Sequence, residues 1–521
     1  MISESHPPRR PVSRRSFLMG GAALAAAAVL PSWTTAAATR ASGMARLLRE
    51  LGTATRGPLV TRSDAGLFLA AQVYNMRFEG RRPLGVLYAL DERDVQAAVR
   101  WAARNEVPIT VRAGGHSYQG YSTINDGLVV DLTNLSAVVP RSGRVPYAHI
   151  GGGTALGVAY GALSRYGLTI PGGTCPTVSV GGLAQGGGLG MVARRWGTLS
   201  DNIQGLRIVT ADGRIRTADA RSERDLLWAC RGGGGGNFGI VTSYEMRTHP
   251  TDAAMGFVFR FDWADCPEVI MAWQEWAHAT GDDMFTMCST LTNADGPNPI
   301  SQVSGQFFGD QAGLAAELAP FLAQVTPAST VIRQASYASL VQFWAQCTHA
   351  AAEQCTRQQM NPGGAEARPY FWGKSDYVAE SAPMDRAGAE VIRDHIAARQ
   401  AMGAGTGEML LDSYGGAINR VAPDATAFAH RDMRYSMQYL AYWNAPDQQE
   451  MGVTWIRGLE RDLVPHVSGQ KYVNYIDSDQ RHDPGVYYGQ NLARLIDTRR
   501  RFDPDDVFRF RQAIPLTHRR G

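Results

Sequence analysis

The arrangement of apolar and polar residues predicts short strands that alternate with helices in the first half of the chain. Residues 87–105 combine an apolar strand, an acidic turn and an amphipathic helix, and residues 108–112 form a further run of strand length. A hairpin is predicted where an Ala-Asp-Gly turn at 211–213 joins apolar runs at 206–210 and 214–217. This half of the chain is therefore expected to repeat a strand, helix and loop order.

The pattern changes near Pro250. From there to about residue 468, glycine becomes rarer and tryptophan and tyrosine become more frequent. Strand-like alternation, as at 255–262, is interspersed with longer helical periods at 267–280 and 384–402. This region predicts an antiparallel sheet with helices on one face, in a domain separate from the preceding one.

Composition and charge describe an ordinary globular protein. The 521 residues suggest two or three domains, with 44% hydrophobic and 19% charged residues. A net charge of +3, without a long basic run, argues against a nucleic-acid partner. The 57 glycines are concentrated in the first half, in local clusters rather than in low-complexity sequence.

The N-terminus carries an export pattern. The run SRRSFL at 13–18 contains Arg14 and Arg15 and leads into an apolar stretch at 18–30, followed by alanines at 36–38. The apolar stretch is too short to span a bilayer, so a cleaved signal over residues 1–40 is predicted, without a stable membrane anchor. The expected partner is the twin-arginine export machinery, and the expected location is periplasmic or secreted, in a bacterium. A disordered basic tail with an alanine-rich helix is the alternative.

Six cysteines are present, at 175, 230, 266, 288, 347 and 355. An exported protein can keep disulfides, and Cys347 and Cys355 are close enough in sequence for a small loop. Scattered buried thiols are an equally good interpretation, because sequence alone does not establish pairing. The spacing of cysteines and histidines does not resemble a zinc site, so no metal is expected.

Two glycine-rich segments carry the chemistry, RAGGHSYQGY at 112–121 and GGTCPTVSVGGLAQGGGLG at 172–190. Each contains one nucleophile, His116 in the first and Cys175 in the second. Glycines allow close approach of the backbone to a ligand, and successive backbone N–H groups in such turns bind anions. Two such loops suggest a cofactor held covalently at two points.

These segments resemble the flavin-attachment motifs of the berberine bridge enzyme-like family, within the vanillyl-alcohol-oxidase-type flavoproteins. The resemblance continues through residues 226–241 to the C-terminal runs at 472–477 and 488–515. In that family the histidine of R-x-G-G-H joins the 8α-methyl group of FAD, and the cysteine of G-x-C-x-T-V-x-V-x-G-L joins flavin C6. His116 and Cys175 match those positions, so the resemblance implies bicovalent FAD. The alternatives are a structural histidine, a buried thiol, and attachment through the histidine alone.

The cofactor-binding residues expected from these motifs extend along both glycine segments and into two later parts of the chain. They are Arg112, Ala113, Gly114, Gly115, His116, Ser117, Gly120, Gly173, Cys175, Val178, Gly181, Gly182, Gly187, Gly188, Gly190, Ile240, Val241, Tyr488 and Asn491.

Two further motifs are rejected. The run GHSYQG misses the G-x-S-x-G spacing of a serine hydrolase by one residue. The run GGGNFG at 234–239 matches G-x-G-x-x-G, but a helix is predicted before it and a strand after it. That order is the reverse of a dinucleotide-binding unit, so NAD binding is not expected.

The resemblance also implies catalytic residues. Tyr475 matches the tyrosine that accepts the substrate proton in oligosaccharide oxidases, Asp412 matches its carboxylate partner, and Tyr414 matches a second tyrosine in relatives acting on antibiotic sugars. A tyrosine with an ordinary pKa of about 10 is a poor base at neutral pH, so it needs a lowered pKa or a partner that takes its proton. Core packing is the alternative for each of the three.

Val178 occupies the position that gates oxygen access in that family. Valine there leaves room for O2, whereas leucine accompanies dehydrogenase behaviour. Simple packing is the alternative interpretation.

Together these observations predict an α+β fold, with a two-subdomain FAD-binding module and an antiparallel-sheet substrate domain with helices on one face. The predicted function is a secreted FAD-dependent oxidase of an alcohol or hemiacetal carbon in a carbohydrate or glycosylated metabolite, with O2 giving H2O2. The alternatives are a dehydrogenase or tailoring enzyme with another acceptor, and a non-catalytic flavin-binding protein. The expected divisions are a signal at 1–40, an FAD-binding domain at 41–250, a substrate domain at 251–468 and a C-terminal segment at 469–521.

Overall fold

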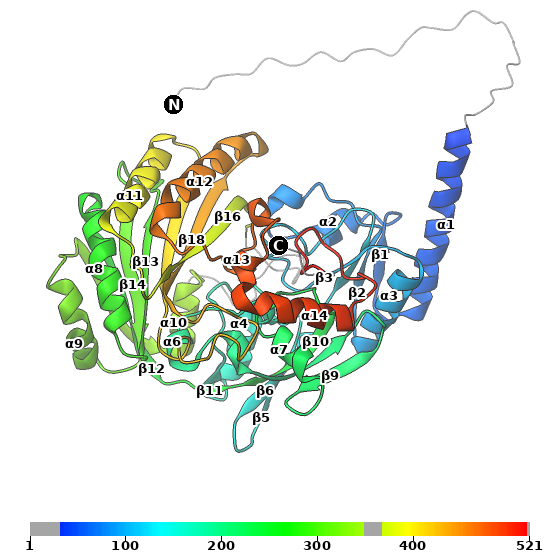
Figure 1. Ribbon diagram of the computed structural model, residues 1–521, viewed down its shortest axis with the longest axis horizontal. Helices are drawn as coiled ribbons and strands as arrows, with labels where there is room; N and C mark the ends of the chain where they lie inside the picture. The colour runs from blue at the N-terminus through cyan, green and yellow to red at the C-terminus, as the bar shows by residue number, and fades with distance from the viewer. Residues whose placement is uncertain (1–31, 348–366, 518–521) are drawn as a thin grey trace, which may run out of the picture. The chain divides into compact units, whose positions relative to one another are not determined.

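The computed structural model describes residues 32–347 and 367–517 (Figure 1). The chain divides into two units, Met1–Arg49 and Glu50–Gly521, and helix α1 (Ser32–Ala54) runs from one into the other. The predicted twin-arginine motif lies outside the described residues, as does Cys355. Within the described part of the chain, no helix combines the length and the apolar character that crossing a membrane requires.

The first sheet of the Glu50–Gly521 unit has four strands in the order β1-β2-β4-β3. Strands β2, β4 and β3 are parallel, and β1 is antiparallel to β2. Helix α3 (Glu92–Arg104) follows β2, as the pattern at 87–105 predicted, and its start is capped by Asp91, whose side chain accepts bonds from two backbone N–H groups. The strands are β1 (Leu59–Thr61), β2 (Gly85–Tyr88), β3 (Ile109–Arg112) and β4 (Leu128–Asp131).

The second sheet is antiparallel, with five strands in the order β5-β6-β10-β8-β9. The predicted hairpin is present as β8 and β9, in which Val209 pairs with Ile215. The strands are β5 (Val138–Arg141), β6 (Tyr147–Gly151), β8 (Ile203–Val209), β9 (Ile215–Asp219) and β10 (Ile240–Arg247). A short pair, β7 (Leu168–Thr169) and β11 (His249–Pro250), lies apart from this sheet.

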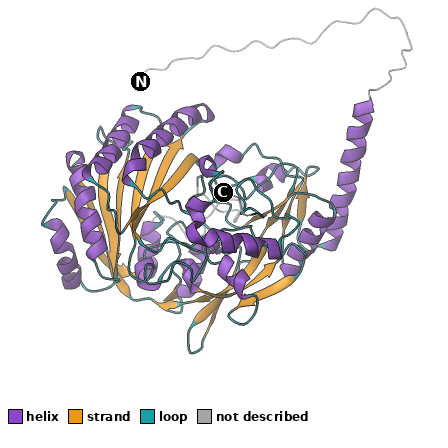
Figure 2. Cartoon of the chain, viewed as in Figure 1, coloured by secondary structure: helices purple, strands orange, loops and turns teal. Residues whose placement is uncertain are grey.

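The third sheet is antiparallel and has seven strands in the order β15-β12-β14-β13-β17-β18-β16. Figure 2 shows helices covering its outer face, which confirms the predicted arrangement. These helices are α8 (Cys266–Ala279), α9 (Gln311–Leu322), α11 (Arg386–Ala401) and α12 (Gln449–Leu463). The strands are β12 (Ala253–Phe261), β13 (Met284–Leu291), β14 (Ile300–Phe307), β15 (Ser329–Ser336), β16 (Tyr370–Ala379), β17 (Gly407–Ser413) and β18 (Met433–Trp443).

Shorter helices lie in the connections between strands. They are α2 (Leu67–Ala71), α4 (Leu156–Ser164), α5 (Val180–Gln185), α6 (Ala193–Trp196), α7 (Arg224–Ala229) and α10 (Tyr337–Trp344). The C-terminal segment adds the 3₁₀ turn η6 (Val473–Tyr475), α13 (Gly485–Tyr488) and α14 (Leu492–Phe502).

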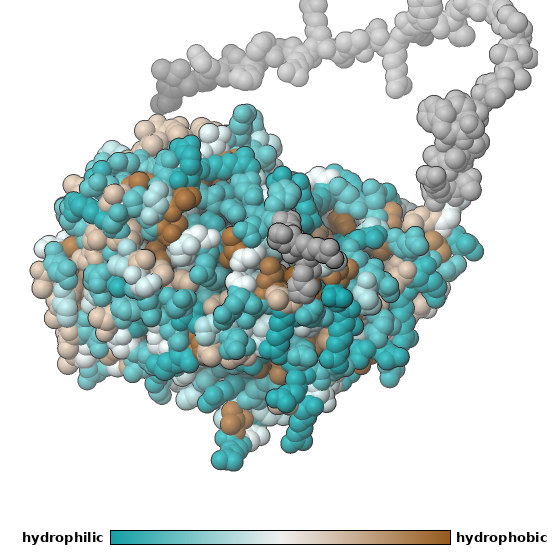
Figure 3. All heavy atoms as spheres, viewed as in Figure 1, coloured by the Kyte–Doolittle hydropathy of each residue, from teal (hydrophilic) through white to brown (hydrophobic). Residues whose placement is uncertain are grey.

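Two large hydrophobic cores hold these layers together. One lies between the seven-stranded sheet and its helices, around Trp273 and Phe321. The other surrounds the five-stranded sheet, where Ile150 and Tyr244 join Leu495 and Ile514 from the end of the chain. The C-terminal segment therefore completes the second core, since it supplies apolar side chains that earlier residues do not. The surface seen in Figure 3 is mainly hydrophilic, with scattered apolar residues.

Candidate active site

A cavity of about 570 Å³ brings the two glycine-rich segments together with strands of the seven-stranded sheet. One wall is backbone-rich and comes from the two glycine segments and the run 234–237. The rest of the lining includes side chains of β13, β17 and β18, together with the η6 turn. We call these the glycine wall and the sheet wall.

The first glycine segment follows β3 and directs His116 into the cavity. The ring of His116 stacks on Tyr74 with centroids 4.1 Å apart, and its Nε2 lies 2.9 Å from Thr177 Oγ1. At Gly114, a Cβ atom would lie 2.6 Å from the backbone nitrogen of Ser179, in the second segment. The two segments therefore pack backbone to backbone, which only glycine permits at this contact.

The second glycine segment places Cys175 at the same wall. Its Sγ lies 3.7 Å from Thr177 Oγ1, so Thr177 contacts both nucleophiles. A Cβ at Gly181 would lie 2.3 Å from the carbonyl oxygen of Gly152, and one at Gly190 would lie 1.8 Å from that of Gly172. His116 and Cys175 thus lie beside the same threonine, on a surface built from closely packed backbone.

Most of the predicted cofactor-binding residues line the cavity. These are Ala113, Gly114, Gly115, His116, Ser117, Gly173, Cys175, Val178, Gly181, Gly182, Gly190, Val241 and Tyr488.

Six predicted residues do not line it and instead support the walls. Arg112 is buried and pairs with Asp131 on β4 at 2.5 Å, which fixes the end of β3. Gly120 lies against the ring of Phe78, Gly187 against Phe428 and Gly188 against Leu199. Ile240 is buried in β10, and the amide of Asn491 donates bonds to backbone carbonyls at 423, 426 and 427.

A third glycine run, at 234–237, lines the cavity but was missing from the predicted binding residues. Gly234 and Gly236 have φ angles of 83° and 78°, which favour glycine. Asn237 donates bonds to the carbonyls of Gly233 and Gly234 and accepts one from the N–H of Ile514. Helix α7 precedes this run and β10 follows it, which confirms the order that argued against an NAD fingerprint. The glycine run itself was the available signal.

Tyr475 lies on the sheet side of the cavity, in the η6 turn. Its ring stacks on Tyr118 at 5.3 Å and meets Tyr472 edge-on at 4.9 Å. Burial, reinforced by the nearby Tyr118 and Asp412, raises the pKa of Tyr475 well above its usual value. The protein alone therefore does not supply the lowered pKa that a tyrosine base would need, and the proton needs another acceptor.

A candidate for such an acceptor is the carboxyl group of Asp412. It lies on β17, lines the cavity, and has its pKa raised to about 7 by burial. Glu408 lies on the same face of β17, since side chains alternate along a strand. Burial raises its pKa to about 7 as well. Glu408 was not predicted, although the alternation of 408, 410 and 412 was a usable signal.

Tyr414 is fully buried and does not line the cavity. Its hydroxyl lies 3.2 Å from that of Tyr377, and both rings belong to an apolar cluster that Tyr475 packs against. Tyr414 thus stands behind the sheet wall.

Further polar residues of the sheet wall were also missed. The side-chain amide of Gln438 donates a hydrogen bond to the hydroxyl of Tyr118, and Tyr442 lines the cavity beside them. No local motif marks these residues, because they come from β18 and the first glycine segment and meet only in the fold. Cys347, close to the cavity-lining Trp344 and Gln346, is disulfide-bonded.

Comparisons with known proteins identify the class. Residues 83–219 match an FAD-binding domain, and residues 471–515 match the berberine and berberine-like family. The walls fit such a cofactor, with glycine backbones that admit no Cβ beside two nucleophiles. The protein is therefore an FAD-dependent oxidoreductase.

Relatives along nearly the whole chain give the family. The FAD-linked oxidoreductase YgaK of Bacillus subtilis is 33% identical over 469 residues, covering 89% of this chain and 98% of the relative. The solved structure of BBE-like 1 from Physcomitrella patens matches with a TM-score of 0.82 and 29% identity, covering 91% of this chain and 99% of that one. Phl p 4, a grass pollen allergen with glucose dehydrogenase activity, matches with a TM-score of 0.80 and 27% identity, covering 90% and 99%. The chain belongs to the berberine bridge enzyme-like family.

Proposed function

We propose that this protein oxidises an alcohol or hemiacetal carbon of a carbohydrate or glycosylated metabolite. The observation that carries the proposal is the shared cavity, in which His116 and Cys175 lie on one wall and Tyr475 and Asp412 on the other. Bound FAD supplies the two-electron acceptor that takes the hydride and passes the electrons to O2, giving H2O2. His116 and Cys175 are the residues that attach it.

Tyr475 and Asp412 act together on the substrate hydroxyl. The Tyr475 hydroxyl accepts the substrate proton while its own proton leaves toward Asp412. This direction follows from the raised pKa of Tyr475, which makes a lasting phenolate unfavourable, and from the pKa of Asp412 at about 7, which makes a carboxylate available at neutral pH. Tyr414, behind the wall, supports the tyrosine cluster.

The polar groups of the sheet wall favour a substrate rich in hydroxyl groups. Glu408 and Asp412 offer acceptors, and Gln438 and Tyr442 offer both donors and acceptors around the same cavity. Aromatic rings of Tyr118, Phe371 and Tyr442 add flat apolar surface. The glucose dehydrogenase activity of the related Phl p 4 supports a carbohydrate substrate.

Val178, which lines the cavity, supports O2 as the acceptor. A Phl p 4 variant with two substitutions, one of them isoleucine to valine, is a glucose oxidase, whereas the variant with the other substitution alone is a glucose dehydrogenase. The second candidate function, a dehydrogenase with another acceptor, is favoured by the native activity of Phl p 4.

Peroxide release across a panel of mono- and oligosaccharides tests the function. A substrate should reduce the flavin without oxygen and release H2O2 in air. Flavin reduction without peroxide would select the dehydrogenase, and no reduction by any sugar or alcohol would overturn the proposal. Asp412→Asn should move the acidic limb of the pH–rate profile for reduction to higher pH, because Tyr475 then loses its proton unaided.

We also propose export by the twin-arginine route, on the strength of Arg14 and Arg15 and the short apolar stretch after them. Replacing both arginines with lysine should leave flavin-loaded protein in the cytoplasm. Unaltered secretion of that variant would exclude this route.

A further inference from the structure

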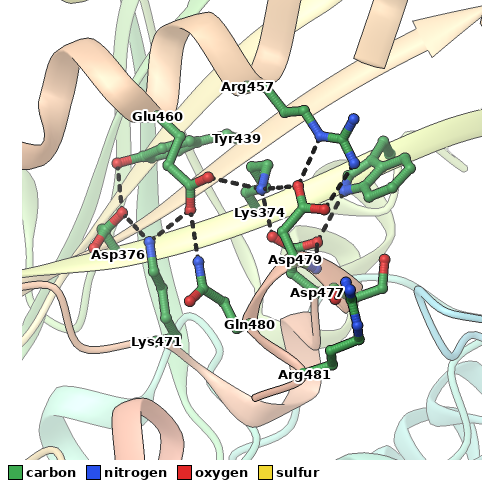
Figure 4. A network of polar contacts seen from close by, with 12 residues as sticks. Lys374, Asp376, Tyr439, Arg457, Glu460, Lys471, Asp477, Asp479, Gln480 and Arg481 are labelled. Carbon is green, nitrogen blue, oxygen red and sulfur yellow. Dashed lines mark hydrogen bonds and ion pairs between the residues drawn. The ribbon is translucent and has the colours of Figure 1, made fainter. Parts of the chain in front are cut away.

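Seven charged side chains, five of them largely buried, form a cluster next to the segment that carries Tyr475 (Figure 4). They come from β16, α12 and the C-terminal segment, and none of them lines the cavity. Any effect of these residues on the reaction must therefore pass through other residues that do line the cavity. The members are Lys374, Asp376, Arg457, Glu460, Lys471, Asp477 and Asp479.

Lys374, on β16, lies at the centre of the cluster and its side chain is 0% exposed (Figure 4). Its Nζ lies 2.7 Å from Glu460 Oε2, 2.5 Å from Asp477 Oδ2 and 2.8 Å from Asp479 Oδ2. Oxygen atoms of these three carboxylates lie within 4.8 Å of one another, close enough to share one cation. The ammonium group of Lys374 takes that position, so all three N–H donors of Lys374 have an acceptor.

A second cation extends the cluster. Lys471 Nζ lies 2.6 Å from Asp376 Oδ2 and 2.8 Å from Glu460 Oε1. Glu460 therefore bridges both lysines, one with each carboxylate oxygen. The Tyr439 hydroxyl donates a bond of 3.1 Å to Asp376. Although burial alone would raise it, the pKa of Glu460 is lowered by Lys471 and Lys374, so this carboxylate stays charged.

The cluster holds both ends of the segment around Tyr475. Lys471 lies four positions before Tyr475, and Asp477 and Asp479 lie two and four positions after it. The other carboxylate oxygen of Asp477 accepts a 3.1 Å bond from Trp372 Nε1, and its backbone N–H donates a 2.9 Å bond to the Tyr487 hydroxyl. The segment is thus tied on both sides of the residue that faces the cavity.

Stability is a poor explanation for such a cluster. Burying ions costs several kcal/mol each, and apolar residues of similar volume stabilise a fold as well or better. What directional ion pairs add is one defined position. A misplacement of about 1 Å in a catalytic group can lower a rate about 10²-fold. We propose that Lys374 is a positioning residue that fixes Tyr475 for proton transfer, an inference that rests on the proposed role of Tyr475.

The test is Lys374→Ala, with propylammonium as the probe. The substitution removes three carbons and the ammonium group, which n-propylammonium replaces. Anaerobic flavin reduction should slow about 10- to 100-fold, with KM changed less than about threefold. Propylammonium should restore at least a tenth of the lost rate, whereas 1-propanol of the same length should not. Wild-type reduction in Lys374→Ala, or equal rescue by 1-propanol, would overturn the proposal.

Two further variants keep the result decisive. Arg386→Ala removes a cation from an exposed ion pair on α11, where Arg386 pairs with Glu268 and Glu390, and should leave reduction unchanged. If Lys374→Ala does not fold, Asp479→Asn removes one carboxylate from the more exposed side of the cluster. It should slow reduction about 3- to 10-fold with covalent flavin retained. A wild-type rate in Asp479→Asn would then overturn the proposal.

A double variant separates this proposal from the proposed function. If Lys374 acts through Tyr475, the pair Lys374→Ala and Tyr475→Phe should be no slower than Tyr475→Phe alone. Additive losses would show that Lys374 acts by another route. Wild-type reduction in Tyr475→Phe alone would instead reject the base assignment, whatever Lys374→Ala does.

Discussion

The two walls of the cavity are built in different ways. The glycine wall is made of backbone, and its shape depends on positions such as Gly114 and Gly181, where any Cβ would overlap a neighbouring main chain. The sheet wall is made of side chains, and its chemistry depends on which residues of β17 and β18 face inward. The glycine wall offers close backbone approach to a flat cofactor, whereas the sheet wall offers polar side chains to a substrate. Attachment and catalysis should therefore be separable by mutation.

The largest effect is expected at the glycine wall, on cofactor attachment. His116→Ala and Cys175→Ala should each leave flavin joined through the remaining residue, and the double variant should release all flavin on acid denaturation. The reason is that each side chain supplies one covalent bond from the same surface. Peptide mapping of the denatured protein measures this. Complete release from either single variant would mean that attachment is at one point only.

At the sheet wall, the largest effect is expected from Tyr475→Phe. The ring can keep its stacking on Tyr118, but the proton acceptor is lost. Anaerobic flavin reduction should slow about 10²–10⁴-fold while the flavin stays attached. Stopped-flow absorbance follows the reaction, and Tyr370→Phe, outside the cavity, is the matched control. Reduction of Tyr475→Phe at the wild-type rate would place the base elsewhere, and not at Tyr414, which does not line the cavity.

Val178→Leu tests whether the glycine wall also controls oxygen. One added methylene beside the flavin should slow reoxidation by about 10-fold or more, with little effect on reduction by substrate. The two half-reactions are measured separately on the same preparation, so each serves as the control for the other. Equal slowing of both would leave simple packing as the role of Val178.

The smallest effect concerns stability at the sheet wall. Burial raises the pKa of Glu408 from 4.5 to about 7, so the folded protein holds a proton that the unfolded chain releases in that window. Wild-type stability should therefore fall as the pH rises from about 4.5 to 7. Glu408→Gln removes the part of this dependence that Glu408 contributes, whereas Asp412, whose pKa is also raised to about 7, keeps its own. The fall in Tm from pH 4.5 to pH 8 should therefore be smaller in the variant than in the wild type, by about 1–3 °C. Exposed Glu450→Gln is the control, and an identical pH response in both variants would contradict the assignment.

The same contrast explains what the sequence predicted well. The glycine wall could be predicted because its requirements are local, since a glycine cluster around His116 or Cys175 is visible in a few consecutive residues. The helices and strands of the first half followed from the spacing of apolar and polar residues, as with the strand, acidic turn and helix at 87–105, where the structure has β2 and α3. The run at 234–237 was recognised through the family resemblance, but its hydrogen bond to Ile514, far along the chain, could not be predicted.

The sheet wall could be predicted only in part. Asp412 and Tyr475 were found through a motif resemblance, and both line the cavity. Glu408 was missed although it alternates with Asp412 on one strand, whereas Gln438 was missed because a strand residue reaches the cavity only if the register of its sheet turns it inward. Tyr414 illustrates the same difficulty, since it lies two positions from Asp412 in sequence and yet stands behind the wall. The upward shift of the Tyr475 pKa could not be predicted from the sequence either, because burial is a property of the fold.

The C-terminal segment has a consequence for biosynthesis. Leu495 and Ile514 complete the core around the five-stranded sheet, and Tyr475, Asp477 and Asp479 belong to the same C-terminal segment. Because synthesis proceeds from the N-terminus, a nascent chain that has not reached these residues lacks both the closing part of that core and the residue proposed as the base. The core around the five-stranded sheet can therefore be completed only after the C-terminal segment has been synthesised. A truncated or stalled product would leave an apolar face of that sheet open to chaperones and proteases.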